Sequence, residues 1–186
     1  MTALAETSFK LTHEELLESV AATFCLQALE RVQVEEQSLA ELGVTTQYGF
    51  TSSSHVEPVG VRFLRITDIN AGDVDWDRVP FCECSEPHKY LLEANDIVIA
   101  RSGSVGKSFQ VFDTPEPTVF ASYMIRLRSH SPLLPRYLYW CLQSQQFWTQ
   151  IMLAQRGSAM ANINAPMLLT LKFPIPSSEI QQATVD

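Results

Sequence analysis

Residues 95–107 have the sequence Asn95-Asp-Ile-Val-Ile-Ala-Arg-Ser-Gly-Ser-Val-Gly-Lys107. The apolar run that begins at Ile97 follows a turn sequence, which predicts a short buried β-strand. The strand then carries basic and small polar residues to its end, namely Arg101, Ser102, Ser104 and Lys107. Such a strand end suits a protein that presents backbone amides and cations to a large polyanion. It is unlike the dry pocket that holds a catalytic group.

A second stretch, Val61-Arg-Phe-Leu-Arg-Ile-Thr-Asp-Ile-Asn70, has the same organisation. It predicts a strand over 61–69 that carries Arg62 and Arg65. The Asn-Ala-Gly-Asp sequence that follows predicts a turn. Further strands are expected over 97–101, 108–112 and 119–127.

Helical periodicity flanks these strands on both sides. The capping box Thr12-His-Glu-Glu15 predicts the start of an amphipathic helix that runs to about Glu36, or as far as Leu42. This helix either packs on its own domain or pairs with a partner helix. Its apolar stripe recurs every four residues at Leu16, Val20, Phe24, Ala28 and Val32.

The C-terminal part also contains helical patterns. The Ser131-Pro132 pair predicts the start of one or two helices over about 132–155, and Asn164 predicts the cap of another short helix. Lys172-Phe-Pro-Ile-Pro176 is expected to be extended, because a residue before proline avoids the α region. The summed pattern predicts an α+β fold.

Composition sets outer limits on the function. The 186 residues, 46% of them hydrophobic, are enough for one domain with a real core. No apolar run approaches the roughly 20 residues that a membrane span requires, and the N-terminus lacks secretory-signal features. We therefore expect a cytoplasmic protein with reduced cysteines and no membrane contact. Cys82-Glu-Cys84 lacks the second ligand pair of a typical zinc site.

The net charge of −8 argues against nonspecific electrostatic binding to nucleic acid. The charge is unevenly distributed, however. Residues 1–42 contain eight acidic residues against only Lys10 and Arg31, whereas the remainder has eleven basic against thirteen acidic residues. Since the acidity belongs mostly to the N-terminal segment, the rest of the chain can still present a basic face.

Motifs for catalysis are incomplete. Gly103-Ser-Val-Gly-Lys-Ser108 differs from a phosphate-binding loop, because Arg101 occupies the position of the first glycine and a strand pattern follows it. The chain contains no Glu-x-Lys of a metal-dependent nuclease and no Gly-x-Ser-x-Gly. We expect no catalytic residue, no metal and no cofactor.

Basic and small polar residues at strand and helix ends remain as candidates for DNA binding. Arginine that donates two hydrogen bonds to guanine is the commonest specific base contact, and other donors hold phosphates. The candidate set is Arg62, Arg65, Arg101, Ser102, Ser104, Lys107, Arg126, Arg156 and Ser158.

Five sequence segments occur in an order that resembles the order of motifs in a known family. They are Leu42-Gly-Val-Thr-Thr-Gln-Tyr-Gly-Phe-Thr, Phe63-Leu-Arg-Ile-Thr-Asp-Ile, the 95–107 stretch, Arg156-Gly-Ser, and Phe173-Pro-Ile-Pro followed by Glu179-Ile-Gln-Gln. This series resembles one target-recognition domain from the DNA-specificity subunit of type I restriction–modification enzymes.

The resemblance implies a mixed, mostly antiparallel sheet with packed helices and a non-catalytic reader of double-stranded DNA. In that family, separate methyltransferase and restriction subunits do the chemistry, and long helices set the spacing between two recognition domains. Here we expect a helical segment over 1–42, a recognition domain over 43–182 and a tail over 183–186 that starts a spacer helix. With one such domain, the chain is expected to act as a half-subunit, and one assembly open to it is a homodimer through helices.

Two alternatives stay open. The first is a protein-interaction module that uses the acidic helix and does not bind DNA. The second is a metal-dependent enzyme. Salt-dependent DNA binding separates the DNA reader from the first alternative, because phosphate contacts make affinity fall steeply with salt.

Overall fold

A computed structural model describes residues 13–70, 72–154 and 162–185. Its helices are α1 (His13–Arg31), α2 (Pro87–Tyr90), α3 (Pro135–Gln143), α4 (Gln145–Ala154), α5 (Ala165–Leu169) and α6 (Ser178–Val185), with 3₁₀ turns η1 (Ile66–Asp68) and η2 (Trp76–Arg78). Its strands are β1 (Glu36–Ser38), β2 (Thr45–Tyr48), β3 (Val61–Leu64), β4 (Ile69–Asn70), β5 (Asp73–Val74), β6 (Phe81–Cys82), β7 (Ile97–Ala100), β8 (Ser108–Gln110), β9 (Thr118–Phe120), β10 (Met124–Arg128) and β11 (Lys172–Pro174).

The central sheet has the strand order β2-β10-β7-β8, and each of its neighbouring pairs is antiparallel. A smaller sheet, β6-β3-β9, combines an antiparallel pair with the parallel pair β3–β9. Two-stranded ladders join β1 to β11 and β4 to β5. The predicted α+β class with a mixed, mostly antiparallel sheet is confirmed.

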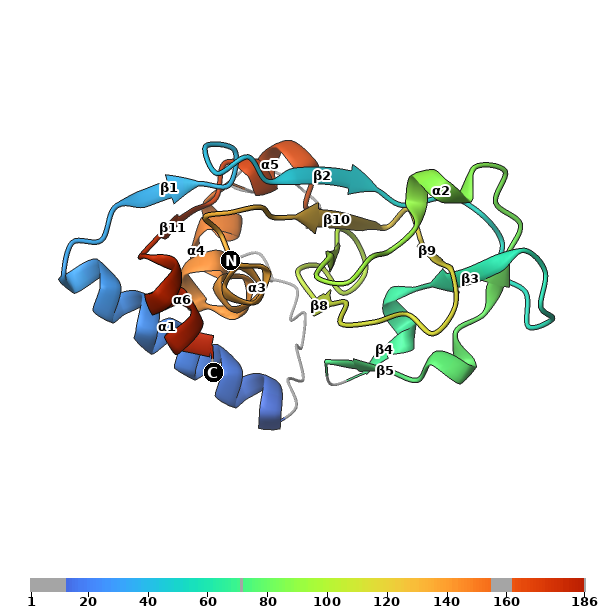
Figure 1. Cartoon of the computed structure of the whole chain (residues 1–186), viewed down its shortest axis with the longest axis horizontal. Helices are drawn as coiled ribbons and strands as arrows, with labels where there is room; N and C mark the ends of the chain where they lie inside the picture. Colours follow the sequence, from blue (N-terminus) through green and yellow to red (C-terminus); the bar gives the residue numbers. More distant parts are fainter. Residues whose placement is uncertain (1–12, 71, 155–161, 186) are drawn as a thin grey trace, which may run out of the picture.

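Strand β7 lies between two hydrophobic clusters. Side chains alternate across a strand, so Ile97 and Ile99 pack into the cluster on the helical side. Val98 and Ala100 pack into the cluster on the other side, with β3, β9 and the β4–β5 hairpin. Figure 1 shows α1, α3, α4 and α6 on the left of the central sheet, and β3, β4, β5 and β9 on its right together with the short helix α2. The continuous apolar run in the sequence therefore reflects burial on both faces.

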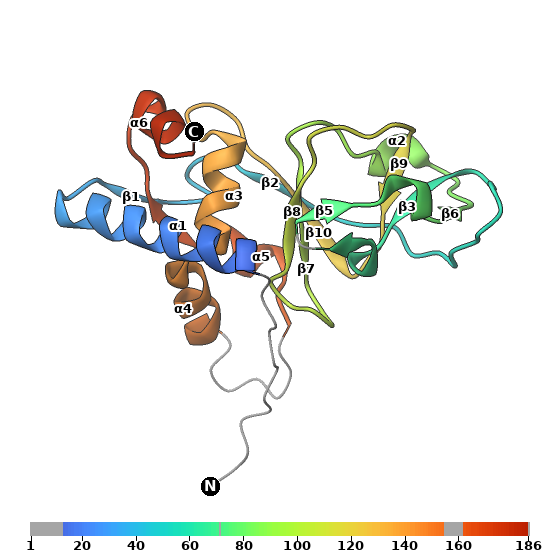
Figure 2. The same ribbon diagram turned by 90° about the horizontal axis from the view of Figure 1, so that it is seen from below.

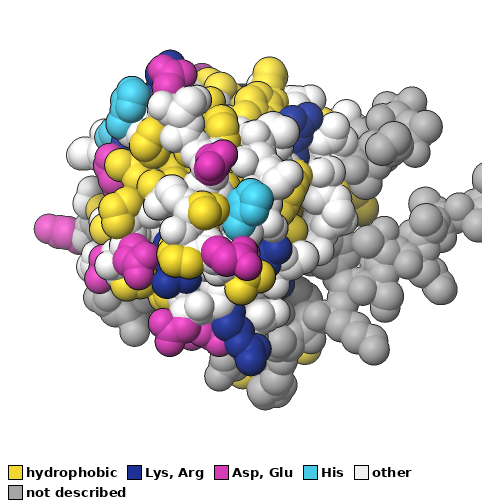
Figure 3. Space-filling view, turned by 90° about the vertical axis from the view of Figure 1, so that its right-hand side faces the viewer, with side chains coloured by type: hydrophobic (Ala, Val, Ile, Leu, Met, Phe, Trp, Pro, Cys, Tyr) yellow, Lys and Arg dark blue, Asp and Glu magenta, His cyan; other side chains and the backbone are white. Residues whose placement is uncertain are grey.

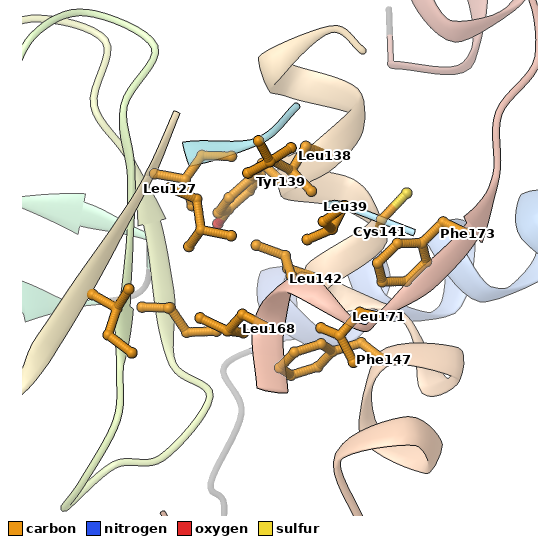
Figure 4. Packing of buried hydrophobic residues seen from close by; sticks show 14 of the residues in the cluster. Leu39, Leu127, Leu138, Tyr139, Cys141, Leu142, Phe147, Leu168, Leu171 and Phe173 are labelled. Carbon is orange, nitrogen blue, oxygen red and sulfur yellow. The ribbon is translucent and has the colours of Figure 1, made fainter. Parts of the chain in front are cut away.

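The helical cluster holds most of the large buried side chains. Figure 4 shows Leu138 and Leu142 of α3 between Leu127 on the sheet side and Phe173 of β11. The hydroxyl of Tyr137 donates to the carbonyl of Pro174 at 2.8 Å, which ties α3 to β11. In Figure 2, α4 and α6 lie on opposite sides of α1. In the described part of the chain, the helices lack the length and apolarity of a bilayer span.

The first helix is shorter than the sequence pattern predicts. It ends at Arg31, and the expected continuation to Glu36 or Leu42 is wrong. Gln33 has φ 57°, and the amides of Gln33 and Val34 donate to the carbonyls of Glu30 and Leu29. These two hydrogen bonds form a Schellman C-cap, in which the left-handed residue is usually glycine. Because a glutamine occupies that position here, the sequence pattern did not predict the end of the helix.

The chain after this cap belongs to the helical core. Strand β1 pairs with β11, and Gln37 lies opposite Phe173. Leu39 and Leu42 are buried in the same cluster as Val44. The expected boundary after residue 42 therefore falls between two core residues, Leu42 and Val44.

The apolar stripe of α1 faces away from this core. Ala22 and Leu26 are buried, whereas Phe24 and Val32 are 73% and 72% exposed. Leu16, Leu17 and Val20 are also about half exposed on the same side. The helix runs along the outer edge of the molecule (Figure 1). The helix therefore packs on its own domain through Ala22 and Leu26, but the predicted apolar stripe takes no part in that packing.

Three other element boundaries differ from expectation. The 61–69 strand ends at Leu64, because the Asp68 carboxylate accepts the Arg65 backbone amide at 2.8 Å and starts the turn η1. The 119–127 segment forms two strands, β9 and β10, and α3 begins at Pro135 instead of Pro132. The predicted cap at Asn164 is confirmed, since its side chain accepts from the Met167 amide at 2.8 Å.

Candidate nucleic-acid interface

The segment after β7 forms a closed loop. The Ala100 amide donates to the Lys107 carbonyl at 2.8 Å, and the Gly106 amide donates to the Ala100 carbonyl at 2.9 Å. Ser102, Gly103 and Ser104 are exposed at the tip, while Val105 is buried in the helical cluster. The expected strand after the loop is confirmed as β8, so the helix N-terminus of a phosphate-binding loop is absent here.

Helix α4 supports the base of this loop. A Cβ atom added at Gly106 would lie 2.1 Å from Cη2 of Trp148, and Gly106 has φ 83°. Gly103 also has a positive φ, of 75°, but its Cβ would meet nothing within 4 Å. Gly106 is therefore required by contact with the tryptophan ring as well as by its backbone conformation.

Two contacts connect the loop to the β-rich side of the molecule, which is the side of the central sheet that packs against β3, β4, β5, β6 and β9. The Lys107 ammonium donates to the Ile69 carbonyl at 2.6 Å, which joins the loop to β4. The Arg101 amide donates to the Tyr123 carbonyl at 2.9 Å. The Arg101 carbonyl accepts from the Ile163 amide at 3.0 Å, so the segment before α5 also lies against the loop.

Arg65 lies close to this group. Its guanidinium donates to both oxygens of Asp68 at 2.6 and 3.0 Å, and to the Ser54 hydroxyl at 3.3 Å. The hydrogen bonds to Asp68 raise the pKa of Arg65. Asp68 precedes Ile69, the partner of Lys107, so Arg65 belongs to the same region. Burial raises the pKa of the neighbouring Tyr123 hydroxyl.

The structure thus gathers five of the nine predicted DNA-binding residues. We call this group the loop site: Arg65, Arg101, Ser102, Ser104 and Lys107. Arg62 is elsewhere, on β3, where it pairs with Glu116 at 3.2 Å and donates to the Val79 carbonyl at 2.7 Å. Its guanidinium also lies 4.3 Å from the ring centroid of Phe81.

Arg126 belongs to a buried charge network on β10. Its guanidinium donates to the Leu91 carbonyl at 2.6 Å and to the side chain of Gln47, and it lies 3.6 Å from Asp96. Burial lowers the pKa of Arg126. Asp96 is 1% exposed and also accepts two hydrogen bonds from Arg128, at 2.6 and 2.9 Å. Both Arg62 and Arg126 stay predictions as DNA contacts, although both already have internal partners.

The last two predicted residues, Arg156 and Ser158, lie outside the described residues. The described part of the chain contains no group of three His, Cys, Asp or Glu side chains that could hold a metal ion. Figure 3 shows the face at the end of the molecule farthest from α1, where acidic and basic side chains are interspersed with hydrophobic ones. The described residues on this face do not form a continuous cationic surface.

Two residues that shape the loop site were not predicted as site residues from the sequence. Tyr48, at the end of β2, places its ring 4.7 Å from the Arg101 guanidinium, and its hydroxyl accepts from the Ala165 amide at 3.0 Å. Trp148 supports Gly106 from α4. The sequence gives an indication for Tyr48 alone, because Tyr48 lies within the 42–51 segment that resembles the family.

Comparisons with known proteins agree with this architecture. The chain is 27% identical over 135 residues to the specificity subunit of the type I restriction enzyme MjaVIII from Methanocaldococcus jannaschii; the match covers 68% of this chain and 32% of that protein. It also resembles the HsdS subunit from Thermoanaerobacter tengcongensis, with a TM-score of 0.62 and 17% identity, over 92% of this chain and 43% of that one.

A third resemblance is to the type I restriction–modification S subunit from M. genitalium, with a TM-score of 0.59 and 16% identity; it covers 91% of this chain and 44% of that one. The chain therefore spans about a third of the curated relative and less than half of either solved structure. The family model for the type I restriction modification DNA specificity domain matches residues 65–186, which include the loop site. This chain belongs to the family of type I restriction–modification DNA specificity domains.

Proposed function

We propose that this chain is the DNA-reading part of a type I specificity subunit. It binds double-stranded DNA sequence-specifically and directs methyltransferase and restriction subunits, and it performs no chemistry itself. Membership of the specificity-domain family supports this function. The observation that carries it is the 101–107 loop, which presents the half-buried Arg101 and the exposed Ser102 and Ser104 at the supported end of β7.

The chemistry of the loop suits a duplex. Serine hydroxyls and backbone amides donate to phosphate oxygens and fix the register of a protein on DNA, while arginine reads base edges. The net charge of −8 opposes binding at long range, so the isolated chain should bind weakly and depend strongly on low salt. Partner subunits then supply much of the affinity.

The test is equilibrium binding of the full chain to a mixed-sequence DNA duplex over a range of salt concentrations. With about three phosphates neutralised, the logarithm of the binding constant should fall with the logarithm of salt at a slope of roughly −3. Ser102→Glu and Ser104→Glu should weaken binding, because each places a negative charge at the exposed tip. Ser85→Glu, at an exposed position before α2, is the control.

Two results would contradict this proposal. One is wild-type protein that shows no salt-dependent binding at all. The other is an equal loss of binding in the Ser85 control and the two loop variants, because general charge repulsion would then explain the effect.

We further propose that the exposed stripe of α1 pairs with α1 of a second copy. Phe24 lies midway between Leu16 and Val32, so an antiparallel copy brings Phe24 against its own equivalent and Leu16 against Val32. This is the self-complementary arrangement of a two-fold interface. The acidic side chain of Glu18 is directed away from the stripe, toward Arg136 at 3.4 Å.

Light scattering after size exclusion tests this pairing. A dimer is expected for the wild-type chain and a monomer for Phe24→Glu. Gln33→Glu, which adds the same charge at the C-cap of the helix, should leave the dimer intact. A wild-type chain that stays monomeric would contradict the pairing, and capture of a purified methyltransferase subunit by that monomer would assign the stripe to the subunit instead.

A further inference from the structure

The arginines of the β-rich side differ in whether their guanidinium groups have hydrogen-bond or ion-pair partners within the protein. Those of Arg62, Arg65 and Arg126 donate to carboxylates, carbonyls or an amide oxygen at the distances given above. Arg128 is held by Asp96, and Arg78 lies 3.5 Å from Asp75. Each of these groups would have to leave an internal partner before it could read a base.

Among the arginines that the structure describes on this side, Arg101 is the exception. Within the described ranges, its guanidinium contacts the Tyr48 ring at 4.7 Å and has neither a hydrogen bond nor an ion pair. A guanidinium stacked on a ring uses only one face of its plane, and the five N–H donors at its edge stay available. No internal bond has to break when this group meets DNA.

The position of Arg101 is also fixed from several directions. Its amide and carbonyl are bonded to Tyr123 and Ile163. The Tyr48 hydroxyl accepts from the Ala165 amide at 3.0 Å, so the ring on which the guanidinium lies is itself held at both β2 and α5. Base readout requires such preorganisation, because a bidentate contact depends on the orientation of the planar fork.

We infer that Arg101 is the base-reading residue of the loop site, that it recognises a guanine in the major groove, and that Tyr48 is its positioning residue. Ser102 and Ser104, at the exposed tip, then contact phosphates on either side. This inference rests on the proposed function, because it assigns one specificity determinant within the same DNA site.

The test is selection of bound duplexes from a randomised double-stranded DNA library by the full chain at about 50 mM salt, where phosphate contacts are strong. The wild-type chain should enrich a short motif with an invariant G·C pair. Arg101→Ala should lose the preference at that pair alone, with an affinity for the selected duplex lower by about 5- to 150-fold. Lys89→Ala, which removes one charge from an exposed side chain on α2, should keep the full motif.

Tyr48 variants separate positioning from general damage. Tyr48→Phe keeps the ring and should retain the preference for guanine, whereas Tyr48→Leu should weaken it while leaving the other positions of the motif unchanged. Thermal melting of each variant shows that it is folded. Arg101→Lys should behave like Arg101→Ala at the G·C pair, because lysine keeps the charge but lacks the planar fork.

Each failure has its own meaning. If the wild-type chain enriches no motif, both the proposed function and this inference are overturned. If the wild-type chain enriches a motif that Arg101→Ala enriches equally, or if the variant binds every duplex more weakly with an unchanged preference, only the inference is overturned, because Arg101 then contacts phosphate or no DNA at all.

Discussion

Replacing Gly106 with alanine should destabilise the chain more than the same change at Gly103. Both glycines have a positive φ, of 83° and 75°, and both lie in the 101–107 loop. They differ in their surroundings, because a new Cβ at position 106 meets Trp148 at 2.1 Å, whereas at position 103 it meets nothing within 4 Å. The pair therefore separates backbone strain from steric conflict.

The magnitudes follow from two contributions. A left-handed alanine costs about 1–2 kcal/mol, and part of this is offset by about 0.4–1 kcal/mol from the lower entropy of the unfolded chain. We therefore expect Gly103→Ala to lower the free energy of unfolding by about 1 kcal/mol. Gly106→Ala adds an overpacking cost of about 1–3 kcal/mol against the tryptophan ring, for a total of about 3 kcal/mol.

Equilibrium urea denaturation measures both values, and a double-mutant cycle with Trp148→Leu identifies the source. The smaller leucine side chain should relieve the conflict, so Gly106→Ala should cost about 1–2 kcal/mol less in that background. If the two glycine variants differ by less than about 0.5 kcal/mol, or if the cycle shows no coupling, then Trp148 of α4 does not support the loop.

Three further changes probe the charge network, the C-terminal anchor and a buried thiol. Asp96→Asn leaves two arginines without their buried carboxylate and should cost about 3–5 kcal/mol in urea denaturation, whereas the exposed Glu93→Gln should cost under about 0.5 kcal/mol. Gln181→Ala removes one accepted and two donated hydrogen bonds at a fully buried side chain and should lower the melting temperature by several degrees. The control is Thr184→Ala, which removes a single hydrogen bond, from the Thr184 hydroxyl to the Ile180 carbonyl. Burial raises the pKa of the Cys82 thiol from 9.0 to about 11, so the thiol loses its proton at a lower pH in the unfolded chain than in the folded one. The free energy of unfolding should therefore fall as the pH rises from 9 to about 11. In Cys82→Ala, the midpoint of urea denaturation should fall less over the same pH range.

The sequence predicts the core strand and the loop well. The run from Ile97 to Ala100 signals a buried strand because apolar side chains on consecutive residues require burial on both faces. The 101–107 segment signals an exposed turn through its glycines and serines. Local composition decides both features, and no distant residue is needed to predict them.

The parts that the sequence could not predict depend on distant contacts. Whether an arginine is free or paired is decided by partners far away in the chain, such as Glu116 for Arg62 and Gln47 for Arg126. The contact between Gly106 and Trp148 is equally non-local.

The first helix also shows that a local sequence pattern does not determine which contacts a segment makes in the fold. Its period-four stripe correctly predicts a helix, but periodicity cannot say which face packs on the core. Here Ala22 and Leu26 are buried and the more hydrophobic face, around Phe24, is exposed. The end of the helix was missed because a left-handed glutamine, Gln33, takes the place of the usual glycine.

Amide hydrogen–deuterium exchange of the full chain at low salt, with and without a DNA duplex, tests directly whether the 101–107 loop contacts DNA. We expect slower exchange at residues 101–107 and at the end of β2 when DNA is bound, with no change in α1. Protection confined to other segments, with an unchanged 101–107 loop, would contradict the claim that this loop holds the DNA.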